Sequence, residues 1–384
     1  MTGARMHAIV ASTVFDGESH RDDCAVLIEA GHIAALMPER DLPRDISAVR
    51  LPEGFWLAPG FIDVQVNGGG GVLLNDDPSA AAMTAIARAH RTFGTTALLP
   101  TLITDEPDKM RAALEAADEA AATNPAILGL HLEGPFISPE KPGIHNRAFI
   151  RKPGADDLAL LTAPRRGVTL VTLAPECAPG GFIAALAKAG VRVALGHSMA
   201  TYEETEAALA DGLTGFTHLF NAMRPLASRD PGPIASALEA PHAFFGMIVD
   251  GEHVAPPLLR LALRGLAHPM LITDAMPPVG GGASGFTLYG QDIRLHDGRL
   301  TNADGTLAGS ALDMASAVRN CVRLLSVSLE DALRFASGNP ARFLGLGASL
   351  GQVKRGYRAD LVAFDPASLT IHCTWLAGEA AAHE

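Results

Sequence analysis

The central part of the chain alternates between short apolar segments and alanine-rich segments long enough to form helices. The apolar segments end, in order, near Asn67, Thr101, Glu133, Pro175, His197, His218, Asp250 and Asp274. Segments with the length and composition of crossover helices follow most of them, at Ser79–Phe93, Pro107–Ala122, Gly181–Ala189, Tyr202–Ala210 and Pro257–Ala267. Strict alternation of strands and helices indicates a parallel sheet, and eight repeats predict an α/β fold, a closed (β/α)8 barrel of the TIM type.

Four of the apolar segments end on side chains that carry chemistry, namely Glu133, His197, His218 and Asp274. A buried carboxylate is costly to desolvate unless a cation, a metal or hydrogen-bond donors meet it. Taken alone, each histidine is more often an ordinary hydrogen-bonded residue, and Asp274 is also compatible with a helix N-cap. Active sites of such barrels lie at the C-terminal ends of the strands, so the four side chains together predict one site.

The two histidines and Glu133 form a set of ligands that zinc enzymes use. Three protein ligands leave the fourth tetrahedral position open for water, which is typical of a catalytic rather than a structural zinc site. A carboxylate near such a water can accept its proton, because a bound metal lowers the pKa of water from 15.7 to about 7. We therefore assign Asp274 as the general base and, later in the reaction, the general acid.

Both ends of the chain contain short segments that favour β-strands. At the start they lie at His7–Val14, Cys24–Glu29 and His32–Met37, and near the end at Asp360–Phe364 and Leu369–Trp375. Turn residues separate them, so we expect a small antiparallel sheet. We predict that the two ends pair into one small β-sandwich domain, formed by residues 1–58 and 346–384, around a barrel at 59–345.

Three further segments interrupt or complete the barrel pattern. Pro277–Gly305 is rich in glycine and too long for an ordinary loop, so we expect a lid or a hairpin excursion over the barrel mouth. A final pair of helices is expected at Ser310–Leu325 and Leu329–Ser337. The glycine run at Gly68–Gly71 does not match a phosphate-binding motif, and we interpret it as a tight loop.

Composition excludes several classes of partner. No apolar run approaches the roughly 20 residues that span a bilayer, so we expect no membrane segment. The formal net charge of −12 disfavours nucleic acids and acidic membrane surfaces but leaves a small anionic substrate open. The N-terminus lacks the pattern of a secretory signal, and the cysteines, Cys24, Cys177, Cys321 and Cys373, are far apart. We expect free thiols in a cytoplasmic protein.

Several motifs, spread over nearly the whole chain, carry a resemblance to a known family. They are Pro59-Gly60-Phe61-Ile62-Asp63, His131-Leu132-Glu133-Gly134-Pro135, Gly143-Ile144-His145, Leu195-Gly196-His197-Ser198, Thr217-His218-Leu219-Phe220-Asn221-Ala222-Met223, Val249-Asp250-Gly251-Glu252-His253-Val254, Thr273-Asp274-Ala275 and Ala308-Gly309-Ser310. With them the chain resembles the N-acetylglucosamine-6-phosphate deacetylases of the amidohydrolase superfamily. The resemblance implies metal-dependent removal of acetate from N-acetylglucosamine 6-phosphate, with a metal-activated water as the nucleophile.

The resemblance also implies roles for residues that the spacing alone does not single out. His145 would contact the sugar and the acetyl carbonyl, and Asn221 with the backbone amide of Ala222 would hold the phosphate. Arg229 and His253 would reach the active site of a neighbouring subunit in a homodimer. Leu307 would line the substrate site, and the cofactor would be one divalent metal ion, zinc or alternatively iron.

One departure from the superfamily pattern affects the metal count. Many amidohydrolases carry His-x-His after the first strand, whereas this chain has Gln65 and Asn67 there. Neutral amides are poor zinc ligands beside imidazole and carboxylate, so we predict a single metal, with Gln65 near the metal-bound water.

Two other functions stay open at this point. The same barrel could act on another N-acetylated sugar phosphate or on a cyclic amide. Alternatively, it could be a non-catalytic scaffold that has lost its metal, although the intact Glu, His, His and Asp set argues against that reading.

Overall fold

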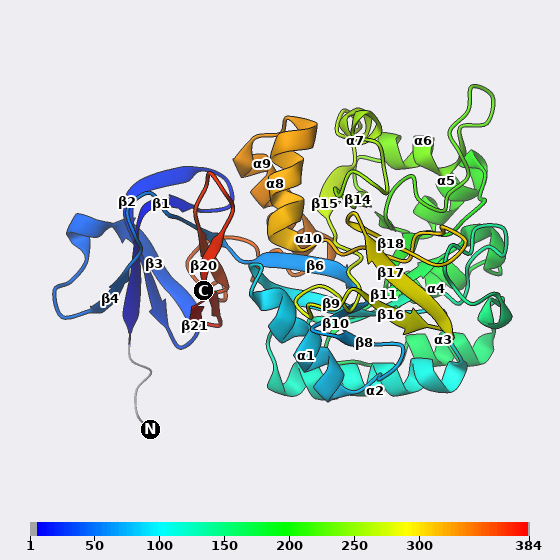
Figure 1. Cartoon of the computed structure of the whole chain (residues 1–384), viewed down its shortest axis with the longest axis horizontal. Coiled ribbons are helices and arrows are strands. Elements are labelled where there is room, and N and C mark those ends of the chain that lie inside the picture. Colours follow the sequence, from blue (N-terminus) through cyan, green and yellow to red (C-terminus); the bar gives the residue numbers. More distant parts are fainter. Residues whose placement is uncertain (1–5, 383–384) are drawn as a thin grey trace.

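The computed structural model describes residues 6–382 and consists of a large barrel beside a small sheet (Figure 1). The barrel strands are β6 (Phe61–Val66), β9 (Thr95–Ile103), β10 (Gly129–Glu133), β11 (Val168–Leu173), β12 (Arg192–Leu195), β13 (Gly215–Phe216), β14 (Phe244–Met247) and β15 (His268–Leu271). They pair in sequence order, and every pair is parallel. The predicted (β/α)8 barrel is confirmed.

The first and last barrel strands, β6 and β15, meet only at their C-terminal ends. There Val66 and Ala275 form a parallel bridge. The amides of Asn67 and Gly68 both donate to the carbonyl of Ala275 at 2.9 Å, and the amide of Asp274 donates to the carbonyl of Gln65 at 3.0 Å. The barrel is therefore nearly closed, and its seam lies beside the predicted site.

Helices cover the outside of the barrel and bury one face each. In α1, for example, Ser79 caps the first turn by accepting from the amide of Ala82 at 3.1 Å, and the face that contains Met83 and Ile86 is buried. The helices are α1 (Ala80–Arg91), α2 (Pro107–Thr123), α3 (Ala155–Leu161), α4 (Phe182–Lys188), α5 (Tyr202–Ala210), α6 (Gly232–Glu239), α7 (Pro256–Ala262), α8 (Met314–Leu325), α9 (Leu329–Ala336) and α10 (Gly338–Phe343), with 3-10 turns η1 (Glu39–Asp41), η2 (Arg147–Phe149) and η3 (Pro175–Cys177).

All the predicted helices are present, although two are shorter than expected. The predicted segment Pro257–Ala267 ends at Ala262, and Ser310–Leu325 becomes helical only at Met314, where Asp313 caps the helix. Sequence analysis did not predict α3, α6 and α10. None of the helices in residues 6–382 is long and apolar enough to cross a bilayer.

The two chain ends pair into one sheet, as predicted. Its strands follow the order β21-β20-β19-β5-β1-β2-β3, with β4 beside β1. Side chains from both ends, among them Ile9, Val26, Leu361 and Trp375, fill a common core. The strands are β1 (His7–Phe15), β2 (His20–Glu29), β3 (His32–Pro38), β4 (Ser47–Arg50), β5 (Trp56–Pro59), β19 (Leu361–Phe364), β20 (Ile371–Leu376) and β21 (Glu379–Ala382).

The expectation of a purely antiparallel sheet was wrong. Both β4 and β5 run parallel to β1, because the chain crosses over after β3 and returns beside β1 in the same direction. Strand β5 then continues into β6 through Gly60 alone. The division into 1–58, 59–345 and 346–384 remains our proposal, and its ends at 1–5 and 383–384 lie outside the described residues.

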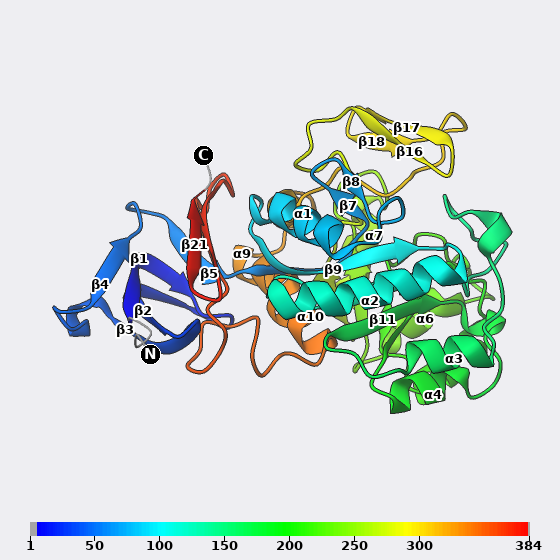
Figure 2. The ribbon, with the colours of Figure 1, turned by 90° about the horizontal axis from the view of Figure 1, so that it is seen from below.

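The excursion after β15 is an antiparallel sheet of β16 (Gly285–Leu288), β17 (Gln291–His296) and β18 (Arg299–Thr301). Figure 2 shows it above the barrel, next to the short strands β7 (Gly68–Gly69) and β8 (Val72–Leu73). Its inner face packs Leu288 and Leu300 against Met276 and Leu73. The predicted hairpin excursion is confirmed, and so is the tight loop, because Gly70 and Gly71 turn the chain with φ of 62° and 83°.

All the cysteines that the sequence contains lie within the described residues, and they are free thiols, as expected.

Asp63 ties the two sides of the barrel seam together. Its side chain is fully buried, and Oδ1 accepts from the amides of Gln65 and Thr273 at 3.1 and 3.4 Å. Its Oδ2 accepts from the hydroxyl of Thr273 at 2.5 Å. Burial raises the pKa of Asp63 to about 7, although these donors oppose the shift.

We expect Asp63→Ala to lower the free energy of unfolding by about 2–4 kcal/mol, because it leaves buried donors on both seam strands without an acceptor. Urea unfolding followed by circular dichroism measures this change. Asp77→Ala, which removes an exposed carboxylate, is the matched control. Equal stability of the two variants would contradict a role for Asp63 at the seam.

Candidate active site

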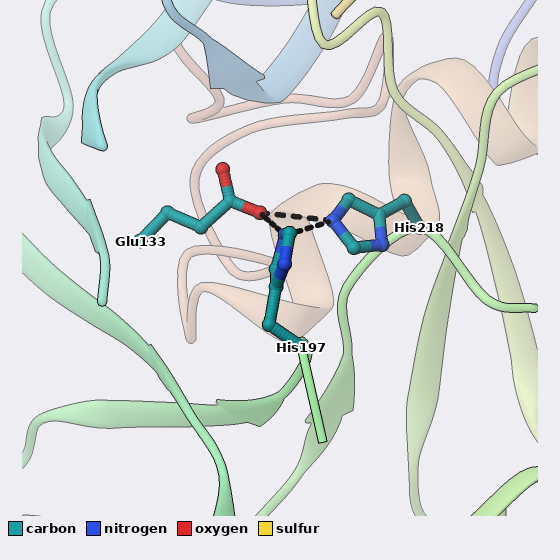
Figure 3. Close-up of side chains that lie close together, drawn as sticks. All are labelled: Glu133, His197 and His218. Carbon is teal, nitrogen blue, oxygen red and sulfur yellow. Dashed lines mark hydrogen bonds and ion pairs between the residues drawn. The ribbon is translucent and has the colours of Figure 1, made fainter. Parts of the chain in front are cut away.

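Three side chains from separate strands converge at the C-terminal end of the barrel (Figure 3). Glu133 is the last residue of β10, and His197 and His218 follow β12 and β13. The Oε1 atom of Glu133 lies 2.9 Å from Nε2 of His218 and 3.2 Å from Nε2 of His197. The two Nε2 atoms are 3.0 Å apart. In the part of the chain that the structure describes, no other group of His, Cys, Asp and Glu has metal-ligand spacing.

The backbone bends sharply to point these side chains inward. His197, His218 and Asp274 all have positive φ, at 49°, 33° and 53°. Such a conformation is costly for residues other than glycine and persists at functional sites where the surroundings hold it. Here hydrogen bonds along the seam hold Asp274, since its amide donates to Gln65 and its carbonyl accepts from the amide of Ser310 at 2.9 Å.

The tautomer of His197 shows that the cluster suits a cation. Its Nδ1 lies 2.8 Å from the carbonyl oxygen of Lys141, which can only accept, so Nδ1 carries the proton. In the neutral ring, the lone pair of Nε2 then points at Glu133 Oε1. Two acceptors so close together need a proton or a metal ion between them, and imidazoles oriented by a backbone carbonyl are typical of metal ligands. The residues therefore fit a divalent metal ion.

The electrostatics of the cluster point the same way. Burial alone would raise the pKa of Glu133, but the hydrogen bonds and charges of His197 and His218 hold it well below its usual range. Burial would likewise lower the pKa of His218, but Glu133 raises it. The carboxylate therefore stays ionised and attracts positive charge to this point.

Gln65 and Asn67 connect the cluster to Asp274. The Nε2 atom of Gln65 donates to Glu133 Oε2 at 3.2 Å and to Asp274 Oδ1 at 3.1 Å. The Nδ2 atom of Asn67 donates to Asp274 Oδ1 at 2.6 Å. Amide N–H groups, rather than lone pairs, thus face the carboxylates. A second cation would meet these donors, so the arrangement favours a single metal.

Asp274 keeps one oxygen free for chemistry. Its Oδ2 makes no hydrogen bond to any residue in the range 6–382, whereas Oδ1 is held by the two amides. Burial, followed by the nearby charge of Glu133, raises the pKa of Asp274 to about 6. A carboxylate with this pKa exchanges protons readily near neutral pH.

His145 packs against His197, with ring centroids 4.3 Å apart, and its Nε2 lies 3.9 Å from Glu133 Oε2. Its Nδ1 accepts from the amide of Thr104 at 3.4 Å and lies 2.8 Å from the Thr104 hydroxyl. Since a backbone amide can only donate, Nδ1 is unprotonated and Nε2 carries the hydrogen. Burial, together with the charge of His197, lowers the pKa of His145 to about 3. His145 is therefore a neutral hydrogen-bond donor.

A cavity of about 470 Å³ opens above these groups. Its volume falls in the range of small-molecule sites. It is lined by Ile103, Glu133, Glu140, Lys141, Pro142, Gly143, Ile144, His145, His197, His218, Asn221, Ala222, His253, Asp274, Met276, Arg299, Gly305, Thr306, Leu307 and Gly309. Most of the residues that sequence analysis assigned to the metal, to catalysis or to substrate line this one cavity.

Two predicted residues, Gln65 and Arg229, do not line the cavity, and a third, His253, lines the cavity of its own chain. Gln65 lies beneath the carboxylates rather than in the cavity lining. Arg229 is exposed on the loop before α6 and does not line the cavity of its own chain. His253 lines its own chain's cavity, where Asp250 Oδ2 accepts from its Nδ1 at 2.6 Å, and its predicted reach into a neighbouring subunit's site stays a prediction.

Sequence analysis missed several contributors to the site. Thr104 orients His145, and its carbonyl in turn accepts from the hydroxyl of Tyr289 on the excursion. Lys141 acts through its backbone carbonyl, so its side-chain type gives no signal. Arg299 enters the cavity from the excursion, and only the glycine-rich break in the barrel pattern pointed to that segment.

Comparison with known proteins agrees with this geometry. The Amidohydrolase family matches residues 56–381. The chain is 39% identical to the N-acetylgalactosamine-6-phosphate deacetylase of Shewanella sp. (strain ANA-3), over 93% of this chain and 91% of the relative. It is 40% identical to the N-acetylglucosamine-6-phosphate deacetylase of Rattus norvegicus, over 84% of this chain and 82% of the relative.

A solved structure extends the likeness to the whole fold. The crystal structure of N-acetylglucosamine-6-phosphate deacetylase from Pasteurella multocida superimposes with a TM-score of 0.95 at 32% identity, covering 98% of this chain and 100% of that one. The chain therefore belongs to the metal-dependent amidohydrolase family, in the group of the N-acetylglucosamine-6-phosphate deacetylases.

Proposed function

We propose that this protein hydrolyses the acetamide of N-acetylglucosamine 6-phosphate to glucosamine 6-phosphate and acetate, in cytoplasmic amino-sugar catabolism or recycling. The observation that carries the proposal is the convergence of Glu133, His197, His218 and Asp274 on one cavity. The names of relatives that match most of the chain supply the substrate class. We propose zinc as the metal, with iron as the alternative, because both accept this ligand set.

The reaction needs a proton acceptor that later becomes a donor. A divalent ion held by Glu133, His197 and His218 would supply the Lewis acidity that makes water a nucleophile near neutral pH. In this proposal Asp274 accepts the proton of the attacking water at its free Oδ2. The same oxygen then gives that proton to the amide nitrogen as the C–N bond breaks, so the amine leaves neutral. The acetic acid that forms loses its remaining proton to solvent and departs as acetate.

His145 would stabilise the negative charge that develops on the acetyl oxygen. Its Nε2 lies 3.9 Å from Glu133 Oε2, on the cavity side of the cluster, and carries a hydrogen that can be donated to that oxygen. A neutral donor suits this role, because it needs no counter-charge in the buried site.

The sugar phosphate would extend away from the cluster along the cavity wall. We propose that the side chain of Asn221 and the amide of Ala222 bind phosphate oxygens, while Leu307 and His253 contact the sugar phosphate from the opposite wall. Arg229 faces solvent in one chain, which suits a residue that reaches the active site of a second subunit. A homodimer is therefore part of the proposal.

Acetate release from matched sugars tests the substrate. We expect turnover of N-acetylglucosamine 6-phosphate and at least about 100-fold lower kcat/KM on unphosphorylated N-acetylglucosamine, because charge-assisted phosphate contacts contribute several kcal/mol. The 6-phosphate of N-acetylgalactosamine is the second candidate, since the Shewanella relative bears that name. Equal rates with and without phosphate would reject a sugar-phosphate substrate, and turnover of only a cyclic amide would reject the deacetylase.

Replacing Asp274 separates proton transfer from metal binding. Asp274→Asn should keep the metal, since Asp274 is not one of the three converging ligands, and lose about 10²- to 10⁴-fold in kcat. Acetate release and elemental analysis are measured on the same sample. Asp304→Asn changes an exposed carboxylate of the excursion and should retain wild-type turnover. Full activity of Asp274→Asn would rule out the proton-shuttle role.

Metal content tests the cluster directly. Protein purified without chelators should hold about one divalent ion per chain, because the described residues contain one set of two His and one Glu with metal-ligand spacing. Glu133→Gln removes the ionised ligand and should reduce the content several-fold, as measured by plasma mass spectrometry. Glu140→Gln, in the same cavity wall, is the control and should change nothing. Two ions per chain would contradict the single-metal proposal, and none would favour a non-catalytic scaffold.

A further inference from the structure

The cavity rim contains a cation that the proposed mechanism does not use. Arg299 is the first residue of β18 on the excursion and lines the cavity together with Thr306 and Leu307. Its Nε lies 3.2 Å from Oε2 of Glu252, the residue before His253. The ion pair therefore joins the excursion to the segment between β14 and α7, directly at the cavity wall.

This ion pair holds Arg299 only weakly. Its side chain is 50% exposed and that of Glu252 is 36% exposed, and solvent screens the attraction between charges that are exposed to this extent. The contact is one of charge alone, because no N–H group of Arg299 donates a hydrogen bond to any residue from 6 to 382. Arg299 therefore presents a guanidinium with its donors unoccupied, and its present partner is easily exchanged.

The charges around the cavity favour an anion at this rim. At the floor of the cavity, Glu133 and Asp274 repel an anionic group of the substrate. Among the described residues, the Lys and Arg side chains that line the cavity are Lys141 and Arg299, whereas Arg229 lies outside it. A phosphate monoester is a near-dianion with several acceptor oxygens, and a guanidinium can bind two of them at once.

We propose that Arg299 binds the phosphate of the substrate within its own chain's cavity, and that Glu252 is the counter-ion that Arg299 leaves when the phosphate arrives. Arg299 is thus a specificity-determining residue supplied by the excursion. This inference rests on the proposed function, because it takes a 6-phosphorylated amino sugar as the ligand.

Binding of glucosamine 6-phosphate, measured by calorimetry against glucosamine, tests the inference without relying on turnover. Arg299→Met keeps the length of the side chain and removes the charge. We expect it to raise the Kd of glucosamine 6-phosphate about 10- to 100-fold, and the KM of N-acetylglucosamine 6-phosphate with it, while kcat on unphosphorylated N-acetylglucosamine stays unchanged. Arg294→Met is the matched control, since Arg294 lies on β17 of the same sheet, is 81% exposed, and pairs with Asp292 at 3.8 Å.

Glu252→Gln distinguishes phosphate binding by Arg299 from a purely structural role of the Arg299–Glu252 ion pair. Removing the counter-ion should lower the Kd of glucosamine 6-phosphate about 2- to 5-fold. If the ion pair only holds the excursion to the barrel, Glu252→Gln should instead weaken binding as much as Arg299→Met does. An unchanged Kd in Arg299→Met, or equal losses on phosphorylated and unphosphorylated sugars, would overturn the inference. If the wild-type protein releases no acetate and Arg299→Met still weakens the binding of glucosamine 6-phosphate, the role of Arg299 is supported. Only the proposed deacetylation is then refuted.

Discussion

The burial of one carboxylate governs the chemistry of this protein. Glu133 is only 2% exposed, and an ionised group in that position is stable only if other parts of the chain surround it with positive charge and donors. His197, His218 and Gln65 meet that need from three other strands. The same convergence creates a site whose ligand atoms suit a cation. The residues that stabilise the buried charge of Glu133 are thus the same residues that would bind the metal.

The barrel seam serves both folding and the site. Strand β6 contains both Asp63 and Gln65. Asp63 accepts hydrogen bonds from Thr273, and the side chain of Gln65 donates to Glu133 and Asp274. Closure of the barrel at its C-terminal end therefore sets the distance between the two acidic groups. Because the Gln65 side chain and the backbone bonds of the seam hold both carboxylates in place, the proposed proton transfer by Asp274 requires little reorganisation.

Sequence patterns were sufficient for the parts of the fold that repeat. Apolar strands that end on Glu133, His197 and Asp274 predicted the barrel and its rim, because every parallel strand delivers its last residue to the same end. Helix α6 was missed because Pro and Gly open it, and the parallel pairing of β4 depends on a crossover that no local pattern encodes. The contribution of Lys141 was unpredictable for another reason, since any residue type supplies the same carbonyl.

The proposed catalytic groups and part of the proposed substrate contacts come from different parts of the chain. Glu133 ends barrel strand β10, and His197, His218 and Asp274 follow strands β12, β13 and β15. Leu307 and Arg299 stand on or beside the excursion, which packs on the barrel through its own small core. The excursion also contacts the floor of the site, because the hydroxyl of Tyr289 donates to the carbonyl of Thr104, whose own hydroxyl lies 2.8 Å from Nδ1 of His145. In this architecture the cation that we propose for substrate selection lies on the excursion, whereas Gln65 holds Glu133 and Asp274 beside the barrel seam.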